Sequence, residues 1–170
     1  MLATIAKAFS VPEIRRKLLF VAAMLAIYRL GAYIPAPGVD VDAVKDLESQ
    51  LTGSNILGFL NLFSGGSLSR LSLFALGIMP YITASIILQL MTVVVPSLER
   101  LQKEGETGQQ KITQYTRYGT LVLAFFQASG IAIALESQPG LVLEPGISFR
   151  LITAITFVTG TMFLMWLGEQ

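Results

Sequence analysis

Residues 71–95 read LSLFALGIMPYITASIILQLMTVVV, a stretch of 25 residues without a charged side chain. Two further uncharged runs lie at 118–135, with 18 residues, and at 151–167, with 17 residues. Uncharged apolar runs of about 18 residues or more are typical of helices that cross a membrane. The sequence therefore predicts an all-α fold, a polytopic bundle of transmembrane helices.

The composition of the 170-residue chain agrees with a membrane protein. Hydrophobic residues make up 53% of it, charged residues only 14%, and the mean hydropathy is +0.65. A soluble domain usually has about a quarter charged residues, and a soluble core this large would need polar helices that the chain lacks. The net charge of +1 does not suggest a nucleic-acid surface. The chain has no Cys or His, which excludes disulfides and the commonest metal ligands. We expect no enzymatic activity and no cofactor.

The beginning of the chain combines basic and apolar residues. Residues 1–17 predict an amphipathic helix on the cytosolic membrane surface, and 18–35 predict a first span that contains Arg29. A signal peptide is the competing interpretation. Against it, the basic region is long and includes Glu13, and the apolar stretch continues past Arg29 without a clear cleavage site. We expect Arg29 to pair with a carboxylate or a backbone carbonyl in the bundle, or to face water.

Residues 56–63 (ILGFLNLF) form an apolar segment that is too short to cross a membrane. As a helix it would reach about 12 Å, less than half the hydrocarbon thickness. A glycine break and Arg70 follow before the long uncharged run. This order predicts a re-entrant half-helix at 56–70, which either builds a substrate site or lines a pore. A surface helix lying over a bundle is the simpler alternative.

The basic residues indicate the orientation. Four lie in 1–17 and four in 97–117, against three on the opposite side, so both segments are predicted to be cytosolic and the N-terminus to lie inside. Pro80 predicts a kink within the second span. The full set of expected segments is the surface helix 1–17, spans at 18–35, 71–96, 118–135 and 151–167, the re-entrant element 56–70 and the cytosolic loop 97–117.

One face of the long span carries an unusual stripe. At 100° per residue, five residues fall within about 80° of arc: Ile78, Ile82, Ser85, Gln89 and Thr92. Branched, uncharged isoleucines suit a narrow apolar constriction, and polar side chains at membrane depth usually face protein or water. The simpler alternative, that Gln89 only hydrogen-bonds a neighbouring helix, stays open.

Taken together, these segments resemble the SecY family of the general secretion pathway, in its bacterial form. The resemblance covers nearly the whole chain and is densest in four strings: YRLGAYIPAPGV (28–39), NLFSGGSLSRLSLFALGIMPYITASIILQL (61–90), KEGETGQQKITQYTRYGTLVLAFFQ (103–127) and GTMFLMWLGEQ (160–170). The strings are long and idiosyncratic, which chance similarity among apolar helices does not produce. Members of this family form ten-span channels in the cytoplasmic membrane for unfolded polypeptides.

The resemblance implies roles for particular residues. Ile78 and Ile82 match the pore ring, and Ser85, Gln89 and Thr92 match one side of the lateral gate, through which signal sequences and membrane helices leave. The half-helix matches the plug that closes the pore, with these residues: Leu57, Phe59, Leu60, Asn61, Leu62, Phe63, Ser64, Gly65, Gly66 and Arg70. The implied partners are SecE, SecG, the SecA motor, the ribosome, signal-bearing polypeptides and the lipid bilayer.

Only four of the ten family spans are expected here, so we interpret the chain as part of such a channel. A secondary transporter with a broken helix is the alternative function. The absence of ionisable residues from the second to fourth spans disfavours it, because ion-coupled carriers commonly place one there. A purely structural bundle leaves the half-helix unexplained.

Overall fold

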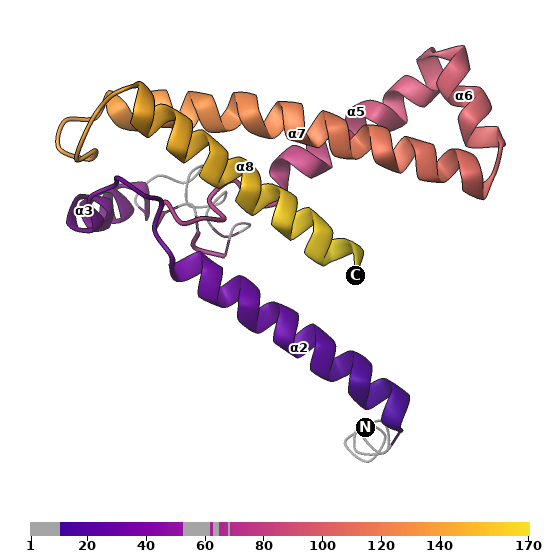
Figure 1. Cartoon of the computed structure of the whole chain (residues 1–170), viewed down its shortest axis with the longest axis horizontal. Helices are drawn as coiled ribbons and strands as arrows, with labels where there is room; N and C mark the ends of the chain where they lie inside the picture. Colours follow the sequence, from indigo (N-terminus) through magenta and orange to yellow (C-terminus); the bar gives the residue numbers. More distant parts are fainter. Residues whose placement is uncertain (1–10, 53–61, 63–64, 68) are drawn as a thin grey trace.

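The computed structural model describes residues 11–52, 62, 65–67 and 69–170. The described part is helical, and its only β-type pairings are two isolated bridges, so the predicted all-α class is confirmed. The helices are α2 (Pro12–Tyr33), α3 (Val41–Thr52), α5 (Met79–Val94), α6 (Pro96–Lys103), α7 (Glu106–Glu136) and α8 (Ile147–Glu169). Figure 1 shows α6, the start of α2 and the C-terminus toward one end of the long axis, and α3 toward the other. We call these the α6 end and the α3 end.

The long helices α7 and α8 lie side by side and form the scaffold. Every fourth residue of α7 is buried, and most of these side chains are small: Gly108, Ile112, Thr116, Thr120, Ala124, Ala128 and Ala132. Small residues let helix backbones approach closely where apolar surface alone cannot hold helices together in lipid. In α8, Phe157 and Gly160 are buried. Close packing through small residues agrees with the sequence pattern, although Gly130 lies exposed.

Helix α2 joins the rest of the molecule through its C-terminal end alone. Gly31 and Ala32 are its only buried residues, and Figure 1 shows the helix diverging from α8 toward its N-terminal end. It begins at Pro12, inside the segment expected to be a surface helix, because proline is well suited to the first helical turn. Residues 1–10 of that predicted surface helix lie outside the described part of the chain.

The long uncharged run is not one continuous helix. Residues 71–77 form a series of turns, and α5 begins only at Met79, so the predicted span at 71–96 is eight residues too long at its start. Gly77 precedes the helix with φ +56°, a left-handed conformation that favours glycine. Pro80 then lies in the first turn of α5, where its missing N–H has no helical partner. The predicted kink at Pro80 is therefore wrong, because the helix starts there.

The predicted loop at 97–117 is mostly helical. After Val95 the chain turns by 100° into the short helix α6, and α7 begins at Glu106, twelve residues before the expected start of its span. Leu101 and Gly108 explain the tight return. A Cβ at Gly108 would lie 1.6 Å from the carbonyl oxygen of Leu101, so only glycine lets α7 pass α6 so closely.

Backbone pairing and a hydrophobic core connect the loops at the α3 end. Residue Pro35 pairs with Ser72 and Val39 pairs with Val142 in isolated antiparallel bridges. In the first of these, the N–H of Ala36 donates to the carbonyl of Leu71 at 2.9 Å. Beneath them lies the main core, which contains Ala36, Val39, Val44, Leu71, Ala75, Leu76, Ala128, Leu135, Leu141, Phe149, Ala154 and Phe157.

Two described helices, α7 and α8, are long and apolar enough to cross a membrane, and the bent pair α5–α6 makes a third if it counts as one span. Helix α2 is not among them. Every 18-residue stretch of α2 includes Arg16, Lys17 and Arg29, which lower its hydropathy. The predicted first span therefore exists as a helix, but its length and composition alone do not identify it as a span.

Candidate functional site

The stripe predicted on the long span lies mainly on the surface of α5. Ile78 is the residue before the helix, and its carbonyl accepts the N–H of Ile82 at 3.0 Å, so both residues share the helical register. Their side chains are 48% and 41% exposed. Branched apolar side chains are normally buried in a folded chain, so two of them exposed one turn apart mark a surface that meets another apolar group.

The polar half of the stripe divides into two parts. Gln89 donates a hydrogen bond from Nε2 to Oγ of Ser85 at 3.2 Å, and Gln89 is exposed. Thr92 is only 4% exposed and donates to the carbonyl oxygen of Gln89 at 2.6 Å. On the helix, Thr92 lies nearest the face that carries Ala84, which packs against Gly119 of α7. Thr92 therefore belongs to the packed face of α5, whereas Ser85 and Gln89 continue the exposed stripe.

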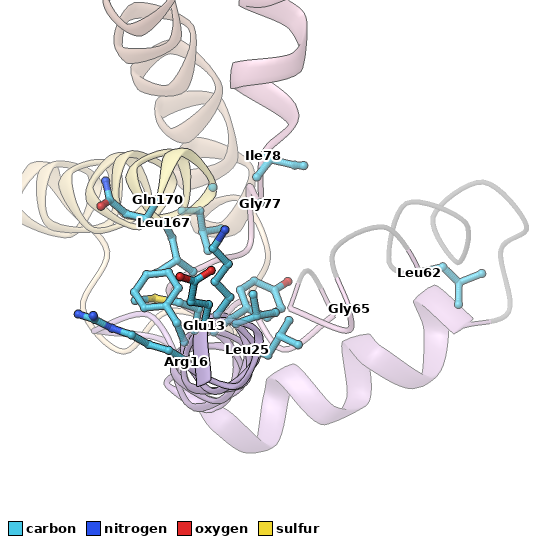
Figure 2. Close-up of a pocket in the computed structure, with 16 residues that line it drawn as sticks. Glu13, Arg16, Leu25, Leu62, Gly65, Gly77, Ile78, Leu167 and Gln170 are labelled. Carbon is cyan, nitrogen blue, oxygen red and sulfur yellow. The ribbon is translucent and has the colours of Figure 1, made fainter. Parts of the chain in front are cut away.

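A groove of about 1300 Å³ runs between α2 and the C-terminal end of α8. Figure 2 shows it with Gly77 and Ile78 beside Leu167 of α8. Gly65 and Leu62 contribute to its lining, whereas Ile82 does not. The structure thus brings one of the two predicted ring residues together with two residues of the predicted plug. The walls are mostly apolar and include Phe20, Val21, Met24, Leu25, Tyr28, Leu164 and Leu167.

Charged groups line the groove only at the first turns of α2. Glu13, Arg16 and Lys17 lie there, with Gln170 of the opposite wall. No group of three or more Asp or Glu side chains within the described ranges is arranged to hold a metal ion. A long apolar groove with charges at one mouth suits a guest that is itself apolar and extended, rather than a small ionic solute.

The glycine break lies against the C-terminal turns of α2. Arg29 donates from Nη1 to the carbonyl oxygen of Gly65 at 3.3 Å, so the expected pairing of Arg29 with a backbone carbonyl is confirmed. Arg70 places its guanidinium carbon 4.5 Å from the centre of the Tyr33 ring, within the range of a cation–π contact. Both ends of the 65–70 segment are thereby joined to the same helix.

Most of the predicted plug lies outside the described residues. Leu62, Gly65, Gly66 and Arg70 are described, and Leu62 is exposed. The remaining predicted plug residues fall outside the described part of the chain: Leu57, Phe59, Leu60, Asn61, Phe63 and Ser64.

An aromatic stack links α2 to α8, and the sequence patterns did not reveal it. Tyr28 stacks on Phe74 with ring centres 5.5 Å apart, and Phe74 stacks on Phe163 at 6.0 Å. Phe163 also contacts Trp166. Phe74 lies close to Gly31, where a Cβ would come within 2.0 Å of the ring. The glycine at position 31, inside an otherwise helical stretch, was the one available sign of a close approach.

Two ion pairs connect α7 and α8. Arg117 forms a bidentate pair with Glu169, with N–O distances of 3.0 and 2.5 Å. Toward the α3 end, the guanidinium of Arg150 pairs with the carboxylate of Glu136. The pairs hold the scaffold helices in register on both sides of their apolar contact.

Comparisons with known proteins give one consistent result. The model of the SecY family matches residues 72–170. The chain is 56% identical over 161 residues to the protein translocase subunit SecY of Escherichia coli K12, an alignment that covers 93% of this chain and 36% of that protein. It is 56% identical to the same subunit of Buchnera aphidicola, with 93% and 45% covered, and 48% identical to that of Streptomyces griseus, with 99% and 41% covered. The chain thus spans less than half the length of these relatives.

Proposed function

Because this chain belongs to the SecY family, we propose that it forms part of the central subunit of a protein-conducting channel. The channel passes unfolded secretory polypeptides across the membrane and releases signal sequences and membrane helices sideways into the lipid. Its action is passive, since an apolar groove supplies no group for acid–base or nucleophilic chemistry. The directional force comes from other components.

The observation that carries this proposal is the position of Ile78. It is exposed, it follows the flexible Gly77, and it lines the apolar groove together with Leu62 and Gly65. A ring that includes Ile78 and Ile82 would close around a moving chain, because stiff branched side chains exclude water without offering hydrogen bonds. The segment that contains Leu62 and Gly65 would act as the plug of this pore.

We assign the lateral gate to the exposed polar part of α5. Ser85 and Gln89 continue the line of Ile78 and Ile82 along the helix, so a signal sequence could leave the pore beside them. Their side chains hydrogen-bond each other, which lowers the cost of facing an apolar guest. Thr92 contributes to packing instead.

The proposed location is the bacterial cytoplasmic membrane, with the α6 end in the cytosol. This orientation is supported by the basic residues of 1–17 and 97–117, and by the lysines and arginines of α6 and the first turns of α7. The proposed partners are SecE and SecG in the membrane, SecA or the ribosome at the cytosolic surface, and signal-bearing polypeptides as cargo.

Photo-crosslinking tests the proposal in the assembled complex. A photoreactive residue at Ile78 or Ile82 should capture the mature part of an arrested secretory precursor. The matched control is Ile87, which is 43% exposed but lies about 180° from Ile78 around the helix. At Ser85 or Gln89 the captured region should be the signal sequence. Equal capture at 78, 82 and 87, or capture at none of them, would refute the assignment of this face to the pore.

A further inference from the structure

The last turns of α2 hold the segment 65–74 by three kinds of contact. The Arg29 guanidinium hydrogen-bonds the Gly65 carbonyl, Arg70 lies over the Tyr33 ring, and Tyr28 stacks on Phe74. We call this set of contacts the α2 clasp. It links a helix with two buried residues to a segment in which Ser67, Ser69 and Phe74 are all buried.

The two sides of this segment are held in different ways. At residues 71–73, backbone hydrogen bonds to Ile34 and Ala36 fix the chain, and the backbone of Leu73 also lies tightly against Gly160. Gly65 and Gly66 lie outside this bridge, and their φ angles are +60° and +83°. A glycine pair has many accessible conformations, so it can serve as a hinge. The hydrogen bond from Arg29 is what attaches this hinge to α2.

The clasp and the groove share residues. Tyr28 and Gly65 both line the groove, and Tyr28 lies against the hinge, with its hydroxyl oxygen 3.4 Å from the place where a Gly65 Cβ would be. A polypeptide that enters the groove therefore contacts the same groups that hold the hinge. One hydrogen bond and one cation–π contact are weak enough for such a guest to displace.

We propose that the α2 clasp is a latch for the resting channel: Arg29 and Arg70 hold the Gly65–Gly66 hinge closed against α2, and the guest in the groove releases it. This inference rests on the proposed channel function and adds a regulatory role for α2. Arg29 and Arg70 act here as positioning residues, because they hold the backbone and do not contact the translocating chain.

The test compares variants of the full-length protein in its assembled complex. Tyr33 is 60% exposed, so its replacement leaves the packed core intact. Tyr33→Leu removes the ring under Arg70, whereas Tyr33→Phe keeps the ring. Arg29→Met removes the donor to Gly65. Arg15→Met is the matched control, since it makes the same chemical change at the opposite end of the same helix.

Two quantities are measured in parallel: the ion conductance of the resting complex in planar bilayers, and translocation of a normal precursor. Tyr33→Leu should raise the resting conductance about two- to fivefold, as expected for loss of a surface cation–π contact. Arg29→Met should raise it about three- to tenfold. The double variant should show the product of the two factors, because the contacts are separate. Tyr33→Phe and Arg15→Met should match the unsubstituted complex.

The outcomes separate the latch from the channel function. Complexes that translocate normally while Tyr33→Leu and Arg29→Met conduct no more than Tyr33→Phe would overturn the latch and leave the channel function intact. An equal rise in Arg15→Met would also overturn it, because the effect would then be independent of the clasp. Failure of the unsubstituted complex to translocate any precursor would overturn the proposed function and, with it, this inference.

Discussion

Replacing Gly160 with alanine tests the contact between α8 and the turn segment that precedes α5. A Cβ at this position would lie 2.2 Å from the carbonyl oxygen of Leu73 and 3.3 Å from Cδ1 of Phe74. Leu73 cannot move aside easily, because its N–H donates to the carbonyl of Ile34 at 2.9 Å. We expect α8 to shift away from this segment in Gly160→Ala.

The size of the effect follows from two opposing contributions. Forcing an extra methyl group into a packed contact costs about 1–3 kcal/mol, and a backbone neighbour places the cost in the upper part of that range. Exchanging a helical glycine for alanine recovers up to about 1 kcal/mol. The net loss of stability should therefore be about 1–2 kcal/mol. Gly130 of α7 provides the control, since a Cβ there would meet no atom within 4 Å.

The measurement is the free energy of unfolding of the purified protein in mixed micelles, titrated with a denaturing detergent. Gly160→Ala should unfold at a lower detergent fraction than the unsubstituted protein, and Gly130→Ala at an equal or higher one. If both variants unfolded together, α8 would not approach Leu73 this closely, and the described packing of the segment 71–77 would be refuted.

Three further predictions concern charged residues outside the apolar contacts. A double-mutant cycle with Arg117→Gln and Glu169→Gln should give a coupling free energy of about 0.5–1 kcal/mol for their partly exposed bidentate pair, and a coupling of zero would contradict the pairing. The hydrogen bond from Lys103 lowers the pKa of Glu99 below its ordinary value of 4.5. The pair therefore stabilises α6 fully above about pH 4.5 and loses this effect as the pH falls through the lowered pKa. A carbon-13 titration should show the Glu99 pKa returning to its ordinary value in Lys103→Gln, and an unchanged pKa would exclude Lys103 as the cause. Single cysteines at Lys103 and Lys45 should react with an impermeant reagent from opposite sides of the membrane, and labelling of both from outside would refute the proposed orientation.

The helical class and the approximate spans were predictable from the sequence, because long uncharged runs are rare outside membrane-spanning helices. The prediction failed at the ends of the helices. Residues 71–77 are as apolar as a helix, and nothing in their hydropathy shows that Leu71 and Gly77 adopt positive φ angles. Pro80 could have indicated a helix start as well as a kink, and tertiary bridging to 34–36 decided between them.

The candidate site was predicted in part. The helical repeat correctly placed Ile78, Ile82, Ser85 and Gln89 on one side of α5, away from its packed face. It could not show that Thr92, on the edge of the same arc, turns inward against α7, because that depends on the position of a neighbouring helix. The stack through Phe74 was also out of reach, since it joins residues from three segments that are far apart in the sequence.

The attachment of α2 at one end alone gives this helix a mechanical property. A helix of 22 residues is about 33 Å long. With its pivot at Gly31, beside the Phe74 ring, a tilt of about 5° would move the Pro12 end by about 3 Å, because the displacement grows with distance along a rigid rod. Helix α2 is therefore a lever: a sub-ångström adjustment of packing beside the glycine hinge becomes a movement of several ångströms at the basic mouth of the groove. Arg16 and Lys17 lie near the moving end, where whatever docks on those charges would feel the state of the hinge.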